Sequence, residues 1–371
     1  MMMDPDTATM LRDAVARHVE RHADGRAIRA RRGSLPGPRA STPEEMAEQG
    51  WLGLALPEEA GGLGLGLPAA ALVVEGLAGS FTSDPFIGLY LAGRVLALAG
   101  GGEDQLAGLG EGRICTALAW QEAPAEFAAP RPQTRFHEGR LTGRKGWIAG
   151  GAGAGFLIVT AQDAAEPVLA LVSTEAEGVR VSPGFRADGS PFAGLELEAA
   201  PAEVLARGAV AEAALRRALD EGSVLIAAEL MGHVDRMMDL TLEHLKTRRQ
   251  FGRAIGAFQA LQHRAADMFV RQRLARAVLD AGITRLADPL DVPALGMQAA
   301  RLRARLNDTA QLIMRESIQL FGAMGITDEN DLSLHVKRCL SLIGWLGNST
   351  EQRRYFMDLA APRGRWPEGR N

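Results

Sequence analysis

The sequence predicts an α+β protein: a helical N-terminal domain, a central antiparallel, barrel-like β domain and a C-terminal bundle of four helices. Hydrophobic residues make up 47% of the chain and aromatic residues only 5%, which favours helices packed through aliphatic side chains. Short β-type runs are confined to the middle of the chain, and long helical periodicities follow them. We therefore expect three domains, at residues 1–112, 113–208 and 209–371.

The first domain is expected to be helical, with one long loop. Apolar spacing predicts a helix over residues 6–31. Ser41-Thr42-Pro43 followed by two glutamates is typical of a helix start, so a short helix should run to about Gly50. Gly50–Gly66 is too rich in glycine for a regular element and predicts a structured loop. Two further helices are predicted, over residues 68–79 and 85–100.

The central domain is expected to hold six or more antiparallel strands. Its β-type runs recur about every ten residues and are separated by turn residues such as Asp188-Gly189. The six runs cover residues 114–120, 146–150, 156–161, 168–173, 178–182 and 194–198.

The C-terminal domain is expected to be a bundle of long helices. The predicted helices cover residues 211–247, 258–286, 293–321 and 332–346. An order of helices, strands and helices does not build a parallel nucleotide-binding sheet. A dinucleotide would therefore bind at a junction between layers.

Composition excludes several classes of protein. The net charge of −4 argues against a nucleic-acid-binding protein, although residues 209–371 carry a net +4 and the first 208 residues a net −8. Cys115 and Cys339 are far apart in apolar surroundings, as in a reduced cytoplasmic protein without a disulfide or metal site. No apolar run is long enough to span a membrane, and the acidic N-terminus does not resemble a signal peptide. We expect a soluble cytoplasmic protein.

Arg248–His263, R-R-Q-F-G-R-A-I-G-A-F-Q-A-L-Q-H, interleaves arginines, glycines and aromatic residues. Arginine presents a planar fork of donors that matches phosphate, and glycine permits close approach of the backbone. The pattern predicts a helix end and turn that meet a planar, polar ligand, with a new helix from about Phe258. A plain helical corner with solvated charges is the other interpretation.

The chain resembles the acyl-CoA dehydrogenases, flavoproteins that oxidise acyl-CoA thioesters to their enoyl forms in fatty acid and lipid metabolism. Four segments carry the resemblance, in the family's order and spacing. They are Arg248–His263, Gly50–Leu65, L-T-G-R-K-G-W-I-A-G-G at 141–151 and Q-L-F-G-A-M-G-I-T at 319–327. The resemblance implies the acyl-CoA dehydrogenase fold, FAD as cofactor, an acyl-CoA substrate and an electron-transferring flavoprotein as acceptor.

The resemblance also implies which residues bind FAD. Arg248, Phe251 and Gln259 match positions that reach across a dimer interface to the partner subunit's FAD. A second strip for the same FAD is matched by Gln319 and the turn formed by Gly322 and Gly325. Trp147 matches an aromatic residue beside the flavin ring. Taken singly, Phe251 could be a core residue, the glutamines helix caps and Trp147 a sheet anchor.

The usual catalytic base is missing. Most of the family place a glutamate twenty-one residues after the glycine turn, and counting from Gly325 gives Leu346 here. A minority place it on an earlier helix, at a position that is Gly222 here, so the adjacent Glu221 is the candidate base. One residue of offset rotates a helical side chain by about 100°, so Glu221 is a candidate only if the helix starts late or bulges there. Otherwise Glu221 is a solvated acid near a helix N-terminus, favoured by the helix dipole, and this is the preferred interpretation. Glu229 is a weaker candidate.

Two further departures affect the chain's own flavin site. The family's T-E-P-x-x-G-S-D motif appears only as W-Q-E-A-P-A-E-F, Trp120–Phe127, where Gln121 and Glu122 could replace its Thr and Glu. Asn348 stands where the family has a threonine.

Two functions follow from this pattern. The first is a FAD-dependent acyl-CoA dehydrogenase that performs α,β-dehydrogenation. Gln319–Leu332 resembles relatives that act on bulky, steroid-like acyl groups. The second is a non-catalytic subunit that completes the FAD site of a homologous partner. The first implies a homodimer or homotetramer, and the second implies a heterotetramer.

Overall fold

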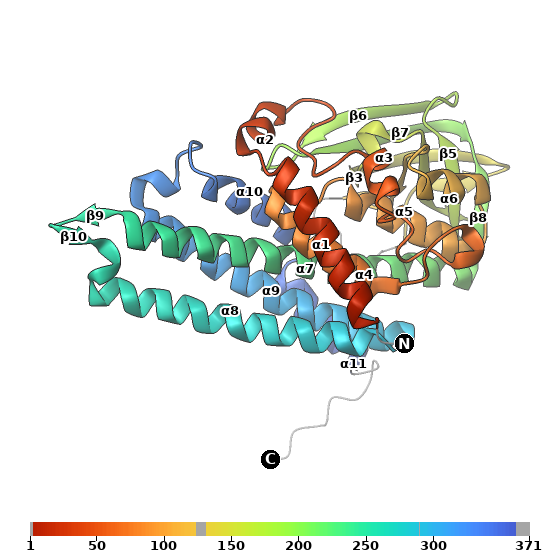
Figure 1. Ribbon diagram of the computed structural model, residues 1–371. Helices are drawn as coiled ribbons and strands as arrows, with labels where there is room; N and C mark the ends of the chain where they lie inside the picture. The colour runs from red at the N-terminus through yellow and green to blue at the C-terminus, as the bar shows by residue number, and fades with distance from the viewer. Residues whose placement is uncertain (1–2, 124–130, 289, 361–371) are drawn as a thin grey trace, which may run out of the picture.

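The computed structural model describes residues 3–123, 131–288 and 290–360 and confirms the α+β class (Figure 1). Helices α1–α6 are followed by an eight-stranded sheet and then by helices α7–α11. The sheet lies toward one end of the long C-terminal helices, and the β9–β10 hairpin projects at the other end (Figure 1). Among the residues described, no helix has both the length and the apolar character that a membrane crossing requires.

The helix predicted over residues 6–31 is two helices, α1 (Pro5–His22) and α2 (Gly25–Arg31). The break follows from Asp24, whose side chain accepts hydrogen bonds from the backbone N–H groups of Arg26 and Ala27 and so starts a new helix. The next prediction is confirmed. Helix α3 (Pro43–Glu48) begins at a capping box in which Thr42 and Glu45 bond each other's backbone.

The rest of the N-terminal part combines the predicted helices with one that was missed. The glycine-rich loop contains a short turn, η1 (Glu58–Ala60), and is followed by α4 (Gly66–Leu77), η2 (Ala78–Ser80) and α5 (Phe86–Ala99). Helix α6 (Glu103–Gly110) was not predicted, because its eight residues include two glycines and only a short apolar pattern.

The sheet contains the six predicted runs and two additional short strands. In chain order the strands are β1 (Thr116–Ala119), β2 (Arg135–His137), β3 (Arg140–Ala149), β4 (Phe156–Asp163), β5 (Glu166–Ser173), β6 (Val179–Phe185), β7 (Pro191–Pro201) and β8 (Glu203–Arg207). Their spatial order is β6-β7-β3-β2-β4-β5-β8, with β1 beside β4. The expected antiparallel sheet is confirmed for most strand pairs, but β1 and β2 both pair with β4 in parallel, which was not predicted. Side-chain alternation is the same for either direction, so the sequence did not reveal it.

The C-terminal part contains the four predicted helices and a fifth. They are α7 (Gly208–Thr247), α8 (Gln259–Leu286), α9 (Val292–Phe321), α10 (Leu332–Gly344) and the unpredicted α11 (Ser349–Ala360). Helix α9 packs against all four others. Helix α7 also contacts α4, α5 and the strands β5 and β8, so it joins the bundle to the rest of the molecule.

A buried charge cluster links the three parts of the chain. We call Arg338, Asp84, Asp188 and Glu229 the Arg338 cluster. The guanidinium of Arg338 lies 2.8 Å from Asp84, 3.0 Å from Asp188 and 2.8 Å from Glu229. These acids come from the loop before α5, the β6–β7 turn and α7, respectively. Burial alone would lower the pKa of Arg338, but the adjacent carboxylates outweigh it and raise that pKa.

We predict that Arg338→Met destabilises the protein by about 3–5 kcal/mol, because it leaves buried carboxylates without their counter-ion. The free energy of unfolding from urea titration measures this. Arg353→Met is the matched control, since Arg353 pairs with Asp308 at the exposed surface and should change stability by less than about 1 kcal/mol. A loss below about 1 kcal/mol for Arg338→Met would contradict a linking role.

Candidate functional site

The stretch that resembles an FAD-binding segment forms a small hairpin at one end of the bundle. Strands β9 (Arg249–Gln250) and β10 (Arg253–Ala254) pair antiparallel around Phe251 and Gly252. Both tip residues have positive φ, 48° and 80°, as two-residue hairpin turns require. The sequence predicted a helix end and a turn but not the hairpin itself.

The hairpin exposes a large aromatic side chain together with cationic ones. The Phe251 side chain is 91% exposed and meets the ring of Phe258 edge-on, 6.1 Å between centroids. The guanidinium of Arg253 lies over the same Phe258 ring at 4.1 Å. Arg248, just before the hairpin, and Gln259, the first residue of α8, are also exposed. The segment therefore presents an aromatic and cationic surface outward.

The second predicted strip lies at the same end of the molecule. Gln319 and Gly322 are exposed where α9 ends in the turn η5 (Gly322–Gly325), and Gly322 has a positive φ of 64°. His244 of α7 stacks on Phe321 of α9 with 4.2 Å between ring centroids, which ties this turn to the helix that leads into the hairpin. Figure 1 shows the hairpin and the α9–α10 connection at one end of the bundle.

Gly325 is buried rather than exposed. A Cβ there would lie 2.8 Å from the carbonyl oxygen of Ile318 and 3.0 Å from the Cβ of Phe321. Glycine at this position therefore lets the turn pack closely on α9.

The two family positions for a catalytic base face each other and are both apolar. Leu346 follows α10, is buried and has a positive φ of 56°. A Cβ on Gly222 of α7 would lie 3.2 Å from a methyl group of Leu346 and 2.6 Å from one of Leu91. Neither position carries a carboxylate, so the chain provides no base there.

Three side chains hold the Leu346 segment in place. Arg303 is fully buried and donates hydrogen bonds to the carbonyl oxygens of Leu342, at 2.7 Å, and Trp345, at 2.5 Å. Gln352 donates to the Leu346 carbonyl at 2.6 Å, and Asn307 contacts the Gly347 carbonyl at 3.4 Å. Burial lowers the pKa of Arg303 to about 9.

The adjacent cleft is filled by indole rings. Trp147 lies in an irregular part of β3, with a positive φ of 53° and 37% of its side chain exposed. With Trp120, Trp345, Leu91 and residues of β1 and α5 it surrounds a gap of about 10 Å³. Such a gap holds about one water molecule, so it does not accommodate a flavin ring or an acyl group.

Glu221 does not point toward this cleft. Its carboxylate accepts hydrogen bonds from Arg94 at 2.7 and 3.1 Å, Arg217 at 3.0 Å and the Tyr90 hydroxyl at 2.9 Å. These groups line a different cavity, of about 480 Å³, between α4, α5, α7 and the α8–α9 connection.

The neighbouring acids of α7 are also engaged in the interior. Asp220 accepts a hydrogen bond from the Tyr355 hydroxyl at 3.1 Å, and burial raises the pKa of its carboxyl to about 7. Glu229, the weaker base candidate, belongs to the Arg338 cluster. Burial alone would raise the pKa of Glu229, but Arg338 holds it well below its usual range.

The strand end that would contact the chain's own flavin is occupied by an internal ion pair. Glu122 lies 2.6 Å from the buried ammonium group of Lys145, which also donates to Thr160 at 2.8 Å. Burial would raise the pKa of Glu122, but the interactions with Lys145 and Thr134 lower it to about 2. Residues 124–127 of the divergent T-E-P motif lie outside the described residues. In the part of the chain that is described, no cluster of His, Cys, Asp and Glu could hold a metal ion.

Sequence reasoning missed the residues that close the cleft. Trp120 and Trp345 were visible as two of only five tryptophans, but nothing local shows that they converge with Leu91. Arg303 was missed for a similar reason. Arginines on a helix usually predict a solvated face, and only the burial of Arg303 beneath the Leu346 segment reveals its role.

Comparisons with known proteins point to one family over most of the chain. The family model "Acyl-CoA dehydrogenase, N-terminal domain" matches residues 5–105, and "Acyl-CoA dehydrogenase, C-terminal domain" matches residues 212–358. The acyl-CoA dehydrogenase IpdE2 of Mycobacterium tuberculosis is 31% identical over 347 residues, covering 91% of this chain and 92% of that protein. FadE34 of the same organism is 29% identical, covering 87% of this chain and 44% of that protein.

Solved structures share the fold. A variant of the Tcur3481-Tcur3483 steroid ACAD has a TM-score of 0.84 and 26% identity, covering 96% of this chain and 98% of that chain. The ChsE4-ChsE5 complex from Mycobacterium tuberculosis has a TM-score of 0.84 and 21% identity, covering 98% of this chain and 99% of that chain. Butyryl-CoA dehydrogenase from Megasphaera elsdenii, at 18% identity and a TM-score of 0.83, confirms the fold again and covers 97% of this chain and 99% of that chain.

We predict that restoring a carboxylate in the cleft destabilises the protein. Leu346→Glu should cost about 3 kcal/mol of unfolding free energy, because the new charge would be buried where Leu346 now packs against Gly222. Urea denaturation measures the effect. Leu346→Met keeps the volume apolar and should cost less than about 1.5 kcal/mol. Equal stability of the two variants would show that the cleft admits water and is open.

Proposed function

Because the chain belongs to the acyl-CoA dehydrogenase family, whose members are FAD-dependent oxidoreductases, we propose that it is a non-catalytic subunit of a heterotetrameric acyl-CoA dehydrogenase. In this assembly it completes the FAD site of a homologous, catalytic partner. The observation that carries the proposal is the mutual packing of Leu346 and Gly222, which puts leucine and glycine at both base positions.

The contrast between the chain's two flavin-facing regions supports this assignment. The outward strip formed by Arg248, Phe251, Gln259, Gln319 and Gly322 is exposed and available to a partner. In the chain's own cleft, the gap beside Trp147 has a volume of only about 10 Å³. The residues of the outward strip therefore fit an FAD held mainly by the partner, and the cleft beside Trp147 does not fit an FAD of this chain's own.

Each chain would have a distinct role at the shared site. FAD supplies the acceptor for the β-hydride when an acyl-CoA is oxidised. In this chain, the Arg248 guanidinium would donate to the pyrophosphate, and Phe251 would cover an apolar face of the cofactor. The partner would contribute the base and the substrate cavity. Electrons would then pass to an electron-transferring flavoprotein, as the family resemblance implies.

We propose a bulky, ring-containing acyl-CoA as the substrate class of the assembly. A structural relative at 26% identity is described as a steroid ACAD, and the similarity covers nearly the whole of both chains. The segment Gln319–Leu332 supports the same class through its resemblance to relatives that act on steroid-like acyl groups.

Flavin content tests the assembly. The chain purified alone should be colourless, and the complex with a co-expressed homologous subunit should hold one FAD per two chains, measured by absorbance at flavin wavelengths. Arg248→Ala should weaken FAD retention by the complex about tenfold to a hundredfold, because a charge-assisted hydrogen bond is lost. A chain that binds stoichiometric FAD alone and bleaches with acyl-CoA would overturn the proposal.

The control for this experiment is Arg180→Ala. Arg180 lies on β6, is exposed and pairs with Glu196 at 2.6 Å, away from the hairpin. Its removal deletes the same charge at the surface and should leave FAD retention unchanged. A loss equal to that of Arg248→Ala would indicate a general effect of net charge.

A second candidate function is an active acyl-CoA dehydrogenase that performs α,β-dehydrogenation with Glu221 as its base. It is favoured by the position of Glu221 at the edge of the 480 Å³ cavity. Glu221→Gln separates the candidates. In the heteromeric assembly it should lower thermal stability but leave the rate of flavin reduction unchanged. A rate reduced by about 10² or more at unchanged FAD content would establish Glu221 as the base.

A further inference from the structure

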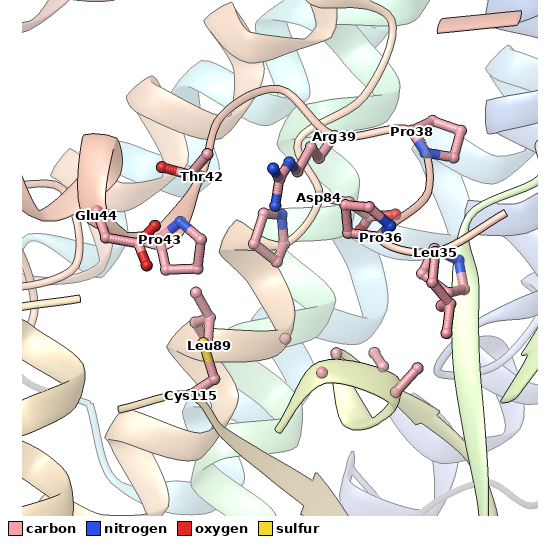
Figure 2. A pocket seen from close by; sticks show the side chains of 17 residues that line it. Leu35, Pro36, Pro38, Arg39, Thr42, Pro43, Glu44, Asp84, Leu89 and Cys115 are labelled. Atoms are coloured by element: carbon pink, nitrogen blue, oxygen red, sulfur yellow. The ribbon is translucent and has the colours of Figure 1, made fainter. Parts of the chain in front are cut away.

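A second cavity, separate from the cleft, lies between the N-terminal helices and the sheet (Figure 2). Its volume is about 610 Å³, within the range of about 300–1,000 Å³ typical of small-molecule sites. Its walls come from the loop at residues 35–44, the start of α5, Cys115 and the turn that follows β3.

The cavity does not continue into the tryptophan-lined gap. Gly88 of α5 packs against the backbone of Ala149 at the end of β3, where a Cβ on Gly88 would lie 3.1 Å from the Ala149 carbonyl oxygen. These two residues line both spaces, so their contact forms the partition between them. The other fifteen of the seventeen residues that line the larger cavity do not line the gap.

The walls of the cavity are mostly apolar and conformationally restricted. Five of the lining residues are prolines, whose rings fix φ and lose no side-chain entropy when a ligand binds. They are Pro36, Pro38, Pro43, Pro85 and Pro191. Leu35 and Leu89 add aliphatic surface on opposite sides (Figure 2). Such walls suit a rigid or elongated apolar body.

Arg39 is the cationic side chain among the residues that line the cavity. Arg39 extends from the loop toward the space above Leu89 and Cys115 (Figure 2). Within the described part of the chain, its guanidinium makes no hydrogen bond or ion pair in this structure. Asp84, which also lines the cavity, is bound to Arg338. Arg39 therefore has its full fork of donors available for an incoming group.

We propose that this cavity binds an amphipathic monocarboxylate, with the apolar body against the prolines and the carboxylate on Arg39. Arginine pairs with a carboxylate through two parallel hydrogen bonds. Glu44 and Asp84 line the same cavity, so a dianionic phosphate would meet more repulsion than a single carboxylate. The proposal does not depend on the FAD assembly or on a partner subunit.

Cys115 provides a built-in reporter for the cavity. It is partly exposed and lines the cavity wall, whereas Cys339 is fully buried and burial raises the pKa of its thiol far above the usual range. The sequence contains no other cysteine. The rate at which N-ethylmaleimide labels the peptide containing Cys115, followed by mass spectrometry, therefore reports occupancy in the full-length protein.

The test compares decanoate, cholate and decan-1-ol as probes on the full-length chain or its co-purified complex. Saturating decanoate or cholate should slow the labelling of Cys115 about tenfold or more, and decan-1-ol should bind about tenfold more weakly than decanoate because it lacks the charge-assisted bond. No protection by either carboxylate at millimolar concentration would overturn the proposal.

Two variants assign the protection to this cavity. Arg39→Gln should reduce decanoate affinity to that of decan-1-ol, whereas the exposed Arg31→Gln in α2 should leave both affinities unchanged. Ala152→Trp places an indole in the cavity and should abolish protection by every probe. Undiminished decanoate protection in Arg39→Gln or in Ala152→Trp would overturn the assignment.

Discussion

The buried guanidinium of Arg338 places a constraint on the rest of the molecule. It requires carboxylates from the loop before α5, from the β6–β7 turn and from α7 to meet at one point. Burying four ionised groups is costly unless each charge is paired and hydrogen-bonded. Moving any of the three acids away from Arg338 would leave a buried charge unpaired, so the folded state disfavours it. Ser83 tightens the arrangement by donating its hydroxyl to Glu229 at 2.6 Å. The relative position of the N-terminal helices, the sheet and the bundle is thereby fixed.

Helix α7 contributes to both flavin-facing regions of the chain, the cleft and the outward strip. Adjacent residues of a helix point about 100° apart, which is why Gly222 meets Leu346 while Glu221 meets Arg94 and Arg217. The same helix carries Glu229 into the Arg338 cluster and ends at Arg248, where the hairpin begins. A single long element thus determines both what the chain's own cleft contains and where its outward strip lies.

The sequence predicted much of the fold because its signals are local. The capping box at Thr42, the boundaries of α8 and α9 and the positions of the β-type runs follow from neighbouring residues. Features that depend on contacts between distant segments could not be predicted from the sequence. The parallel pairing of β1 with β4, the contacts of Glu221 with Tyr90 and Arg94, and the convergence of Trp120 with Trp345 all join segments far apart in the chain. The outward strip could be named from the resemblance, whereas the cleft is closed by side chains from distant segments that no local pattern brings together.

The cleft and the outward strip differ in how much their residues contribute to the stability of this chain, and the difference bears on function. Leu346, Trp120 and Trp345 are explained by packing, since all three are buried and burying such side chains stabilises the fold by about 1.5–3 kcal/mol each. Phe251 has no such explanation. With 91% of its side chain exposed on a strained hairpin tip, it contributes little to the stability of this chain and costs solubility. A residue that its own fold does not need is best understood through contacts outside the chain, and Arg248 beside it favours a planar, anionic cofactor there.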